Sequence, residues 1–170
     1  MRVTARRRVR AILGEIESLI PYPWHVDTMV DRLAEHRSRP ILLLPWDFPF
    51  TACRASGLWI PTDRADYIFY NRSATPTVRQ QIIGHELAHM LLGHAPPLAE
   101  APTSLLEALA PSLSPALTRR LLQAARARTS YDLEEEAVAE EFGTRLVRLG
   151  ASKRQAGGRD ELGRLTDALQ

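Results

Sequence analysis

The stretch 80–94, QQIIGHELAHMLLGH, combines residue types that can do metal chemistry. His85 and His89 are four residues apart, so on a helix their side chains project from one face, one turn apart. Two imidazoles arranged in this way can bind one zinc ion, and Glu86 beside the first of them can hold a water and accept its proton. The spacing therefore predicts two metal ligands, His85 and His89, and a catalytic base, Glu86.

The surroundings of these residues favour a metal site over a chance match to the pattern. Apolar residues lie on more than one side of the expected helix: Ile82, Ile83, Leu87, Met90, Leu91 and Leu92. Such a helix should be buried. Two histidines and a glutamate inside it would be costly unless they were paired or bound a metal.

His94, the third histidine of the stretch, is not expected to bind the metal. In the HExxHxxGxxH pattern, a glycine follows the first histidine by seven residues and the third ligand follows it by ten. Leu92 and Ala95 occupy those positions here. Gly93 comes one residue after the position of the pattern's glycine, and His94 comes one residue before the position of its third ligand. We expect His94 to lie just past the helix end, as a cation near the helix C-terminus.

A zinc hydrolase of this kind needs a third protein ligand, and a glutamate from a second helix can supply it. The acidic segment 131–146, YDLEEEAVAEEFGTRL, contains the candidates. At about 100° per residue, one face of this helix is apolar and the opposite face carries Glu136, Glu140 and Gly143. We predict that Glu136 binds the metal, that Glu140 accepts a hydrogen bond from a ligand histidine, and that Gly143 permits close helix packing. Three other glutamates remain alternatives for the third ligand: Glu134, Glu135 and Glu140.

Helical spacing of apolar residues predicts long helices, and breakers mark their ends. Their expected ranges are 3–20, 26–36, 75–92 and 133–149. Thr75 is the expected N-cap of the histidine-bearing helix, with Pro76 at its first position and Gly93 as its left-handed stop. Residues 95–130 are expected to form short helical pieces, and the tail 151–170 to be either mobile or a short docked helix.

Short segments between these helices predict three strands, at 40–46, 57–60 and 67–70. The last two flank a turn rich in Pro and Asp, which predicts a β-hairpin. The order of elements favours a single domain over residues 1–150. Its expected class is α+β, mainly helical, with a small sheet of about three antiparallel or mixed strands.

The bulk properties limit the class of protein. A chain of 170 residues with 45% hydrophobic residues suits one globular domain. A net charge of only +2 without a recognition motif argues against direct nucleic-acid binding as the primary role. Cys53 is the only cysteine, which excludes an intramolecular disulfide and a multi-thiolate zinc site. No apolar run approaches the roughly 20 residues that cross a membrane, and Glu15 and Glu17 interrupt any signal-peptide core. A cytoplasmic protein is therefore expected.

Three stretches of the chain together resemble the ImmA/IrrE family of small bacterial zinc metallopeptidases. They are 57-GLWIPTDRADYIFYN-71, 82-IIGHELAHMLLGH-94 and 128-RTSYDLEEEAVAEEFGTRL-146. The chain looks especially like actinobacterial members, in which an Arg-Thr/Ser-x-Tyr stretch precedes the acidic helix. Family members often carry Glu-x-Glu-Ala-Glu followed by Ala-Thr. Aligned on Thr144, this chain has Val138 at the family's second Glu and Gly143 at its Ala, a departure that favours Glu136 as the ligand.

The resemblance implies a gluzincin-like, or more broadly zincin-like, fold that holds Zn2+ and makes one specific cut in a protein partner. That partner is typically a helix-turn-helix repressor encoded nearby, while other family members are labelled toxin components of toxin–antitoxin pairs. Tyr131 immediately precedes the ligand helix and is a candidate donor to the oxyanion, or else packs at the helix start. Strand 66–71 is a candidate sheet edge for an extended substrate, or else plain core. The alternative function is a non-catalytic zinc-containing regulator that binds its partner, for which Glu86 would not be required.

Overall fold

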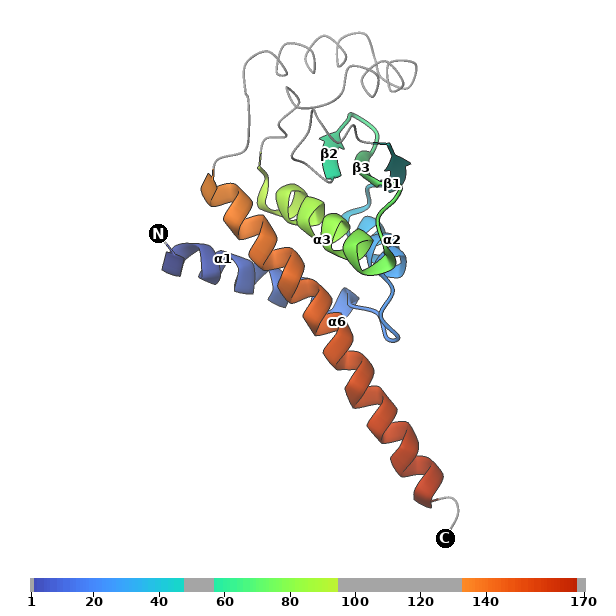
Figure 1. The fold of residues 1–170 in the computed structure, drawn as a ribbon. Coiled ribbons are helices and arrows are strands. Elements are labelled where there is room, and N and C mark those ends of the chain that lie inside the picture. The colour runs from blue at the N-terminus through green and yellow to red at the C-terminus, as the bar shows by residue number, and fades with distance from the viewer. Residues whose placement is uncertain (1, 48–56, 95–132, 168–170) are drawn as a thin grey trace.

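The computed structural model describes residues 2–47, 57–94 and 133–167 of the chain (Figure 1). Its long helices are α1 (Arg2–Glu15), α2 (Val26–Arg37), α3 (Pro76–Leu92) and α6 (Leu133–Asp167). The strands are β1 (Ile41–Trp46), β2 (Gly57–Pro61) and β3 (Asp66–Asn71). The fold is therefore α+β and mainly helical with a small sheet, which confirms the prediction. Cys53, Tyr131 and the expected helical pieces of 95–130 lie outside the described residues.

The first helix is shorter than the range 3–20 predicted for it. α1 ends at Glu15, and a 3-10 turn over Glu17–Leu19 follows it. In that turn the Leu19 N–H bonds to the carbonyl of Ile16, only three residues back. The apolar spacing continues across the junction, because residues before and after it are buried in the same core. They are Val9, Leu13, Ile16 and Ile20.

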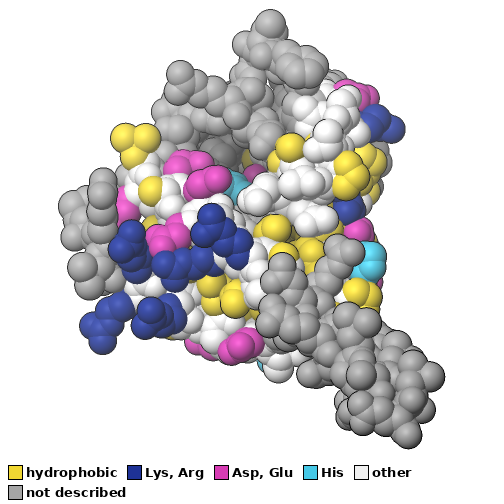
Figure 2. Space-filling view, turned by 60° about the horizontal axis from the view of Figure 1, so that its bottom comes forward, with side chains coloured by type: hydrophobic (Ala, Val, Ile, Leu, Met, Phe, Trp, Pro, Cys, Tyr) yellow, Lys and Arg dark blue, Asp and Glu magenta, His cyan; other side chains and the backbone are white. Residues whose placement is uncertain are grey.

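The basic run at residues 6–10 lies on α1, where part of its charge is used within the fold. Arg8 donates a hydrogen bond of 2.8 Å to the carbonyl of Leu92 at the end of α3. Arg6 lies 3.7 Å from the Glu141 carboxylate on α6, and Arg145 lies 2.6 Å from the same oxygen. Figure 2 shows Lys and Arg side chains gathered with Asp and Glu side chains on this face. The basic residues thus help to join α1 to α3 and α6.

The sheet is mixed, and β3 is its central strand. β1 pairs with β3 in parallel, from Ile41 opposite Asp66 to Trp46 opposite Asn71. β2 pairs with β3 antiparallel, with Gly57 opposite Tyr70, so the predicted hairpin is confirmed. The expectation that strand 66–71 is a sheet edge is wrong, because both of its sides are already paired. Among the described strands the outer positions belong to β1 and β2.

A buried carboxylate, Asp66, ties the sheet to the end of α2. It accepts hydrogen bonds from Arg37 Nη1 at 3.0 Å and Arg39 Nε at 2.9 Å. Its other oxygen accepts from the Trp59 indole N–H at 3.1 Å. Because a buried charge is tolerated only when it is paired and hydrogen-bonded, this cluster fixes the register of β2 on β3.

α3 lies between the sheet and α6, and it contacts α6, β2, β3 and α2 (Figure 1). Its buried side chains join one continuous core with residues of α1, α2, the sheet and α6. The α6 residues in that core lie on the apolar face of this helix: Val138, Phe142 and Leu146, with Leu149 packed against them. The histidine-bearing helix is therefore central to the domain.

The chain after residue 150 continues α6 and does not form a separate element. The helix runs without a break to Asp167 and projects beyond the rest of the fold (Figure 1). Gly157 and Gly158 cost about 1 kcal/mol each relative to alanine, but good helix formers such as Lys153, Arg154 and Leu162 flank them. This finding differs from the expected mobile tail or short docked helix. Within the described residues, no helix has both the length and the apolar character that crossing a membrane requires.

Candidate metal centre

The caps of α3 set its length and place the two histidines in its second half. The Thr75 side chain accepts a hydrogen bond from the Val78 N–H, and Pro76 occupies the first turn. Gly93 ends the helix in the left-handed conformation, at φ 69°. Each of these features is as the sequence predicts. A helix with both ends fixed holds His85 and His89 in register toward α6.

Three side chains from α3 and α6 converge on one point. The Nε2 atoms of His85 and His89 are 2.9 Å apart. The Glu136 carboxylate lies 3.4 Å from His85 Nε2 and 3.6 Å from His89 Nε2. A tetrahedral ion with bonds of about 2.0–2.1 Å would hold its ligand atoms about 3.3–3.4 Å apart. The two contacts of Glu136 are close to this spacing, while the two histidine nitrogens are closer together than it. These three residues could hold a metal ion, and they form the one group of this kind within the described ranges.

A contact between two glycines brings α6 close enough for Glu136 to reach the histidines. A β-carbon on Gly143 would lie 3.0 Å from the backbone nitrogen of His85 and 3.1 Å from the carbonyl carbon of Gly84. Such distances are tighter than most real Cβ contacts, so a larger residue here would require the backbone of α3 to shift by a few tenths of an ångström. The predicted role of Gly143 in close helix packing is confirmed. Glu136 and Glu140 lie on the same face, seven and three residues before it.

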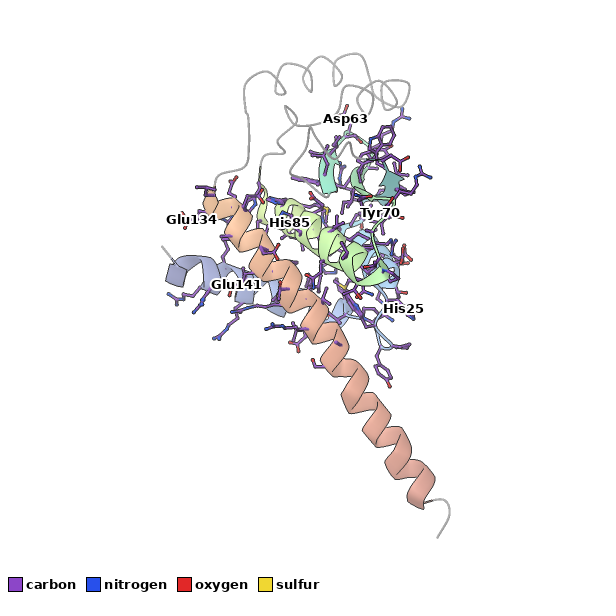
Figure 3. The ribbon with its side chains drawn as sticks, in the orientation of Figure 1. His25, Asp63, Tyr70, His85, Glu134 and Glu141 are labelled. Atoms are coloured by element: carbon purple, nitrogen blue, oxygen red, sulfur yellow. The ribbon has the colours of Figure 1, made fainter. Side chains whose placement is uncertain are left out.

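The centre is buried on the α3 side and open on the α6 side. His89 is fully buried, whereas the Glu136 side chain is 43% exposed. Figure 3 shows His85 on α3 near the first turns of α6, where Glu134 is labelled. Burial lowers the pKa of His89 to about 3, with smaller contributions from His85 and His94. His89 is therefore neutral at physiological pH, which is the form that binds a metal.

Glu86 is buried beside this group with one carboxylate oxygen lacking a partner. The backbone N–H of Trp59 on β2 donates to the carboxylate. Gly57, at the start of β2, packs so closely that a β-carbon there would lie 2.9 Å from Glu86 Oε1. The other oxygen, Oε2, is buried with no hydrogen-bond partner in the described part of the chain. Burial, and secondly the charge of Glu136, raises the pKa of Glu86 to about 8.

An unpartnered buried carboxylate oxygen costs roughly 1–3 kcal/mol. Its position next to three convergent side chains that could hold a metal ion is what a site for a metal and a water requires. A cation bound beside Glu86 would also favour its ionised form. The residues present thus fit a metal ion together with a basic carboxylate.

Glu140 lies where the sequence predicts a partner for a ligand histidine. One of its oxygens is 3.5 Å from Nδ1 of His85, the ring nitrogen that faces away from His89. Its side chain is 75% exposed, so water competes for the same interaction. The structure places Glu141 in an ion pair with Arg145, four residues on.

His94 is placed differently from the prediction of a cation at the helix end. It is only 6% exposed, and its Nδ1 lies 2.9 Å from Nδ1 of His89. The reason is local: Gly93 turns the chain back, and the His94 N–H bonds to the carbonyl of His89 at 3.0 Å. Burial lowers the pKa of His94, so it is not a cation there. The glycine immediately before it was the feature of the sequence that could have indicated this reversal.

Sequence reasoning also missed the contribution of β2. Gly57 and the backbone of Trp59 both contact Glu86, and the sequence carries no local pattern that relates them to it.

A scan of this chain against protein-family models found no match, and searches of curated proteins and of solved structures likewise found no match.

Proposed function

We propose that this protein is a zinc-dependent metallopeptidase that makes a site-specific cut in a partner protein. The observation that carries the proposal is the convergence of His85, His89 and Glu136 beside a buried carboxylate, one oxygen of which has no hydrogen-bond partner among the described residues. A purely structural metal site would not need a fourth, unsatisfied acidic group. The cost of burying Glu86 is understandable if that group does chemistry.

Zinc is the metal of choice for this ligand set, because two imidazoles and one carboxylate leave a fourth position open. When bound, zinc would lower the pKa of a coordinated water towards about 7 and polarise the scissile carbonyl. His85 and His89 would hold the ion through Nε2, and Glu136 through its carboxylate. Glu86 would accept the proton of the attacking water at Oε2 and later deliver it to the leaving amine.

The fold supplies a surface along which an extended peptide could approach Glu86. β2 is an outer strand of the described sheet, and its first residue packs directly on the Glu86 carboxylate. A peptide paired with β2 would carry its backbone past the site, a recurrent mode of peptide recognition. This strand takes the place of strand 66–71, which is enclosed on both sides.

The identity of the partner rests on the resemblance to the ImmA/IrrE family. That resemblance supports a helix-turn-helix repressor encoded nearby as the substrate. A toxin–antitoxin role and a non-catalytic zinc-containing regulator that acts by binding are the alternatives. Only the enzyme requires Glu86 to be a base, so this residue separates the two classes.

The direct test is to incubate the zinc-loaded protein with the repressor encoded beside it. We expect a single cut with wild type, none with Glu86→Gln, and unchanged cutting with Glu35→Gln, a matched change on the exposed side of α2. Zinc content should be equal in all three proteins. An intact repressor after incubation with wild type, or its loss with Glu86→Gln as well, would sink the peptidase proposal.

A further inference from the structure

We infer that His94 is the positioning residue for the metal ligand His89, acting as the acceptor that fixes the proton on the far side of the His89 ring. This inference rests on the proposed metal site and adds a residue to it. It stands on geometry: Nδ1 of His94 and Nδ1 of His89 are 2.9 Å apart, and both rings are buried.

The positions of the ring nitrogens decide which of them carries a proton. Nε2 of His89 faces Nε2 of His85 and the Glu136 carboxylate, so this is the atom that would bind the metal. A metal binds the unprotonated nitrogen, which leaves the proton of a neutral imidazole on Nδ1. That proton points to His94, whose Nδ1 must then accept it. The single proton of a neutral His94 ring is therefore on Nε2.

The backbone at the end of α3 holds His94 in place for this role. Gly93 adopts φ 69°, and the N–H of His94 bonds to the carbonyl of His89 at 3.0 Å. Arg8 of α1 donates to the carbonyl of Leu92 at 2.8 Å, which secures the same turn from the other side. These contacts fix the backbone of His94, from which its side chain reaches the His89 ring.

The two ligand histidines thus have partners of different kinds, each suited to its surroundings. The partner of His85 is Glu140, whose carboxylate is 75% exposed and therefore stays hydrated. His89 has a neutral imidazole, at a buried position where an unpaired carboxylate would be costly. Partners of this type orient the ring and typically contribute 10–100-fold to metal affinity.

Zinc affinity, measured by competition with a chelator, tests the inference without any assay of activity. We expect the zinc dissociation constant to rise about 10–100-fold in His94→Phe, which keeps a ring but has no acceptor. His94→Gln, whose side-chain oxygen can accept, should recover part of the loss. His36→Phe, at an exposed position of α2, should leave the affinity unchanged. Equal affinity in wild type and His94→Phe would overturn the inference.

The ring protons of the wild-type protein give a second measurement that needs no variant. In nitrogen-15 NMR spectra of the zinc-loaded protein, we expect His89 to carry its proton on Nδ1 and His94 on Nε2. A proton on Nδ1 of His94 would contradict the assignment, and this test stands even if His94→Phe fails to fold. Absence of zinc binding by wild type would instead overturn the metal site itself, so the two failures can be told apart.

Discussion

Gly143 of α6 and Gly84 of α3 meet backbone to backbone, and a β-carbon on either would be in a tight contact: one on Gly84 would lie 3.2 Å from the Cα of Gly143. This contact sits one residue from His85, so the separation of the two helices sets the reach of Glu136. The crossing therefore belongs to the architecture of the candidate metal site as much as to the core.

Gly143→Ala is expected to push α6 away from α3 and to weaken both the fold and the site. Overpacking of this kind costs about 1–3 kcal/mol in the free energy of unfolding, and zinc affinity should fall because Glu136 moves outward. Thermal unfolding in chelator and zinc competition measure the two effects separately. Gly14→Ala is the control, since a β-carbon there meets nothing within 4 Å. It should stabilise α1 by up to about 1 kcal/mol. Unchanged zinc affinity in Gly143→Ala would contradict the link between the crossing and the site.

Replacing the acidic residues of α6 one at a time should rank them by their distance from the histidine nitrogens. Glu136→Ala removes a ligand, so its loss of zinc affinity should exceed the roughly 10–100-fold expected for an outer partner. Glu140→Ala should lose about 10-fold or less, because its carboxylate is exposed. Glu141→Ala, which breaks only an ion pair with Arg145, should bind zinc like wild type. Full zinc occupancy in Glu136→Ala would redirect the assignment to Glu134, Glu135 or Glu140.

The parts of the fold predicted from the sequence are those set by local rules. Thr75, Pro76 and Gly93 determine the ends of α3 through contacts within a few residues. The shared face of Glu136 and Gly143 follows from helical periodicity alone. Once Gly143 is known to pack on Gly84, that periodicity is enough to bring Glu136 to the histidines.

The features that the sequence did not predict depend on contacts between distant segments or on a reversal of the chain. β3 is central because β1, some 25 residues earlier, pairs with it in parallel, and nothing within strand 66–71 indicates that partner. The sequence predicts a cation at His94 because positive charge near a helix C-terminus is favourable. The turn at Gly93 instead carries it back into the core. Glu86 was predicted as a base, but its contacts with Gly57 and Trp59 depend on how the sheet sits on α3.

Asp66→Asn is expected to destabilise the protein because two arginines lose the charge that they share. Removing one partner from a buried ion pair costs about 3–5 kcal/mol, and the partial exposure of Arg37 and Arg39 should bring the loss to the lower end of that range. Chemical denaturation at pH 7 measures it. Asp63→Asn, in the exposed turn between β2 and β3, is the matched control and should change stability by less than about 0.5 kcal/mol. Similar stabilities for the two variants would contradict the role given to Asp66.

Glu86→Gln should stabilise the metal-free protein, and the gain should grow with pH. The pKa of Glu86 is about 8 in the folded protein and 4.5 when unperturbed. Below pH 4.5 the group is protonated in both states and has no effect. As the pH rises towards 8, the unfolded chain loses this proton before the folded one. The free energy of unfolding of wild type therefore falls by up to about 1.4 kcal/mol per pH unit. Glutamine has no such proton, so the free energy of unfolding of the variant does not fall in this way. The stability difference between the variant and wild type should therefore be roughly 3 kcal/mol larger at pH 7 than at pH 4.5.

Denaturation of both proteins in chelator, at several pH values, measures this difference. All other titrating groups are common to the two proteins and cancel to a first approximation. If the stabilities of wild type and Glu86→Gln change in parallel from pH 4.5 to 8, Glu86 does not have a raised pKa in the folded protein. With zinc bound, the difference should shrink, because a cation beside Glu86 stabilises its ionised form and so offsets the effect of burial on its pKa.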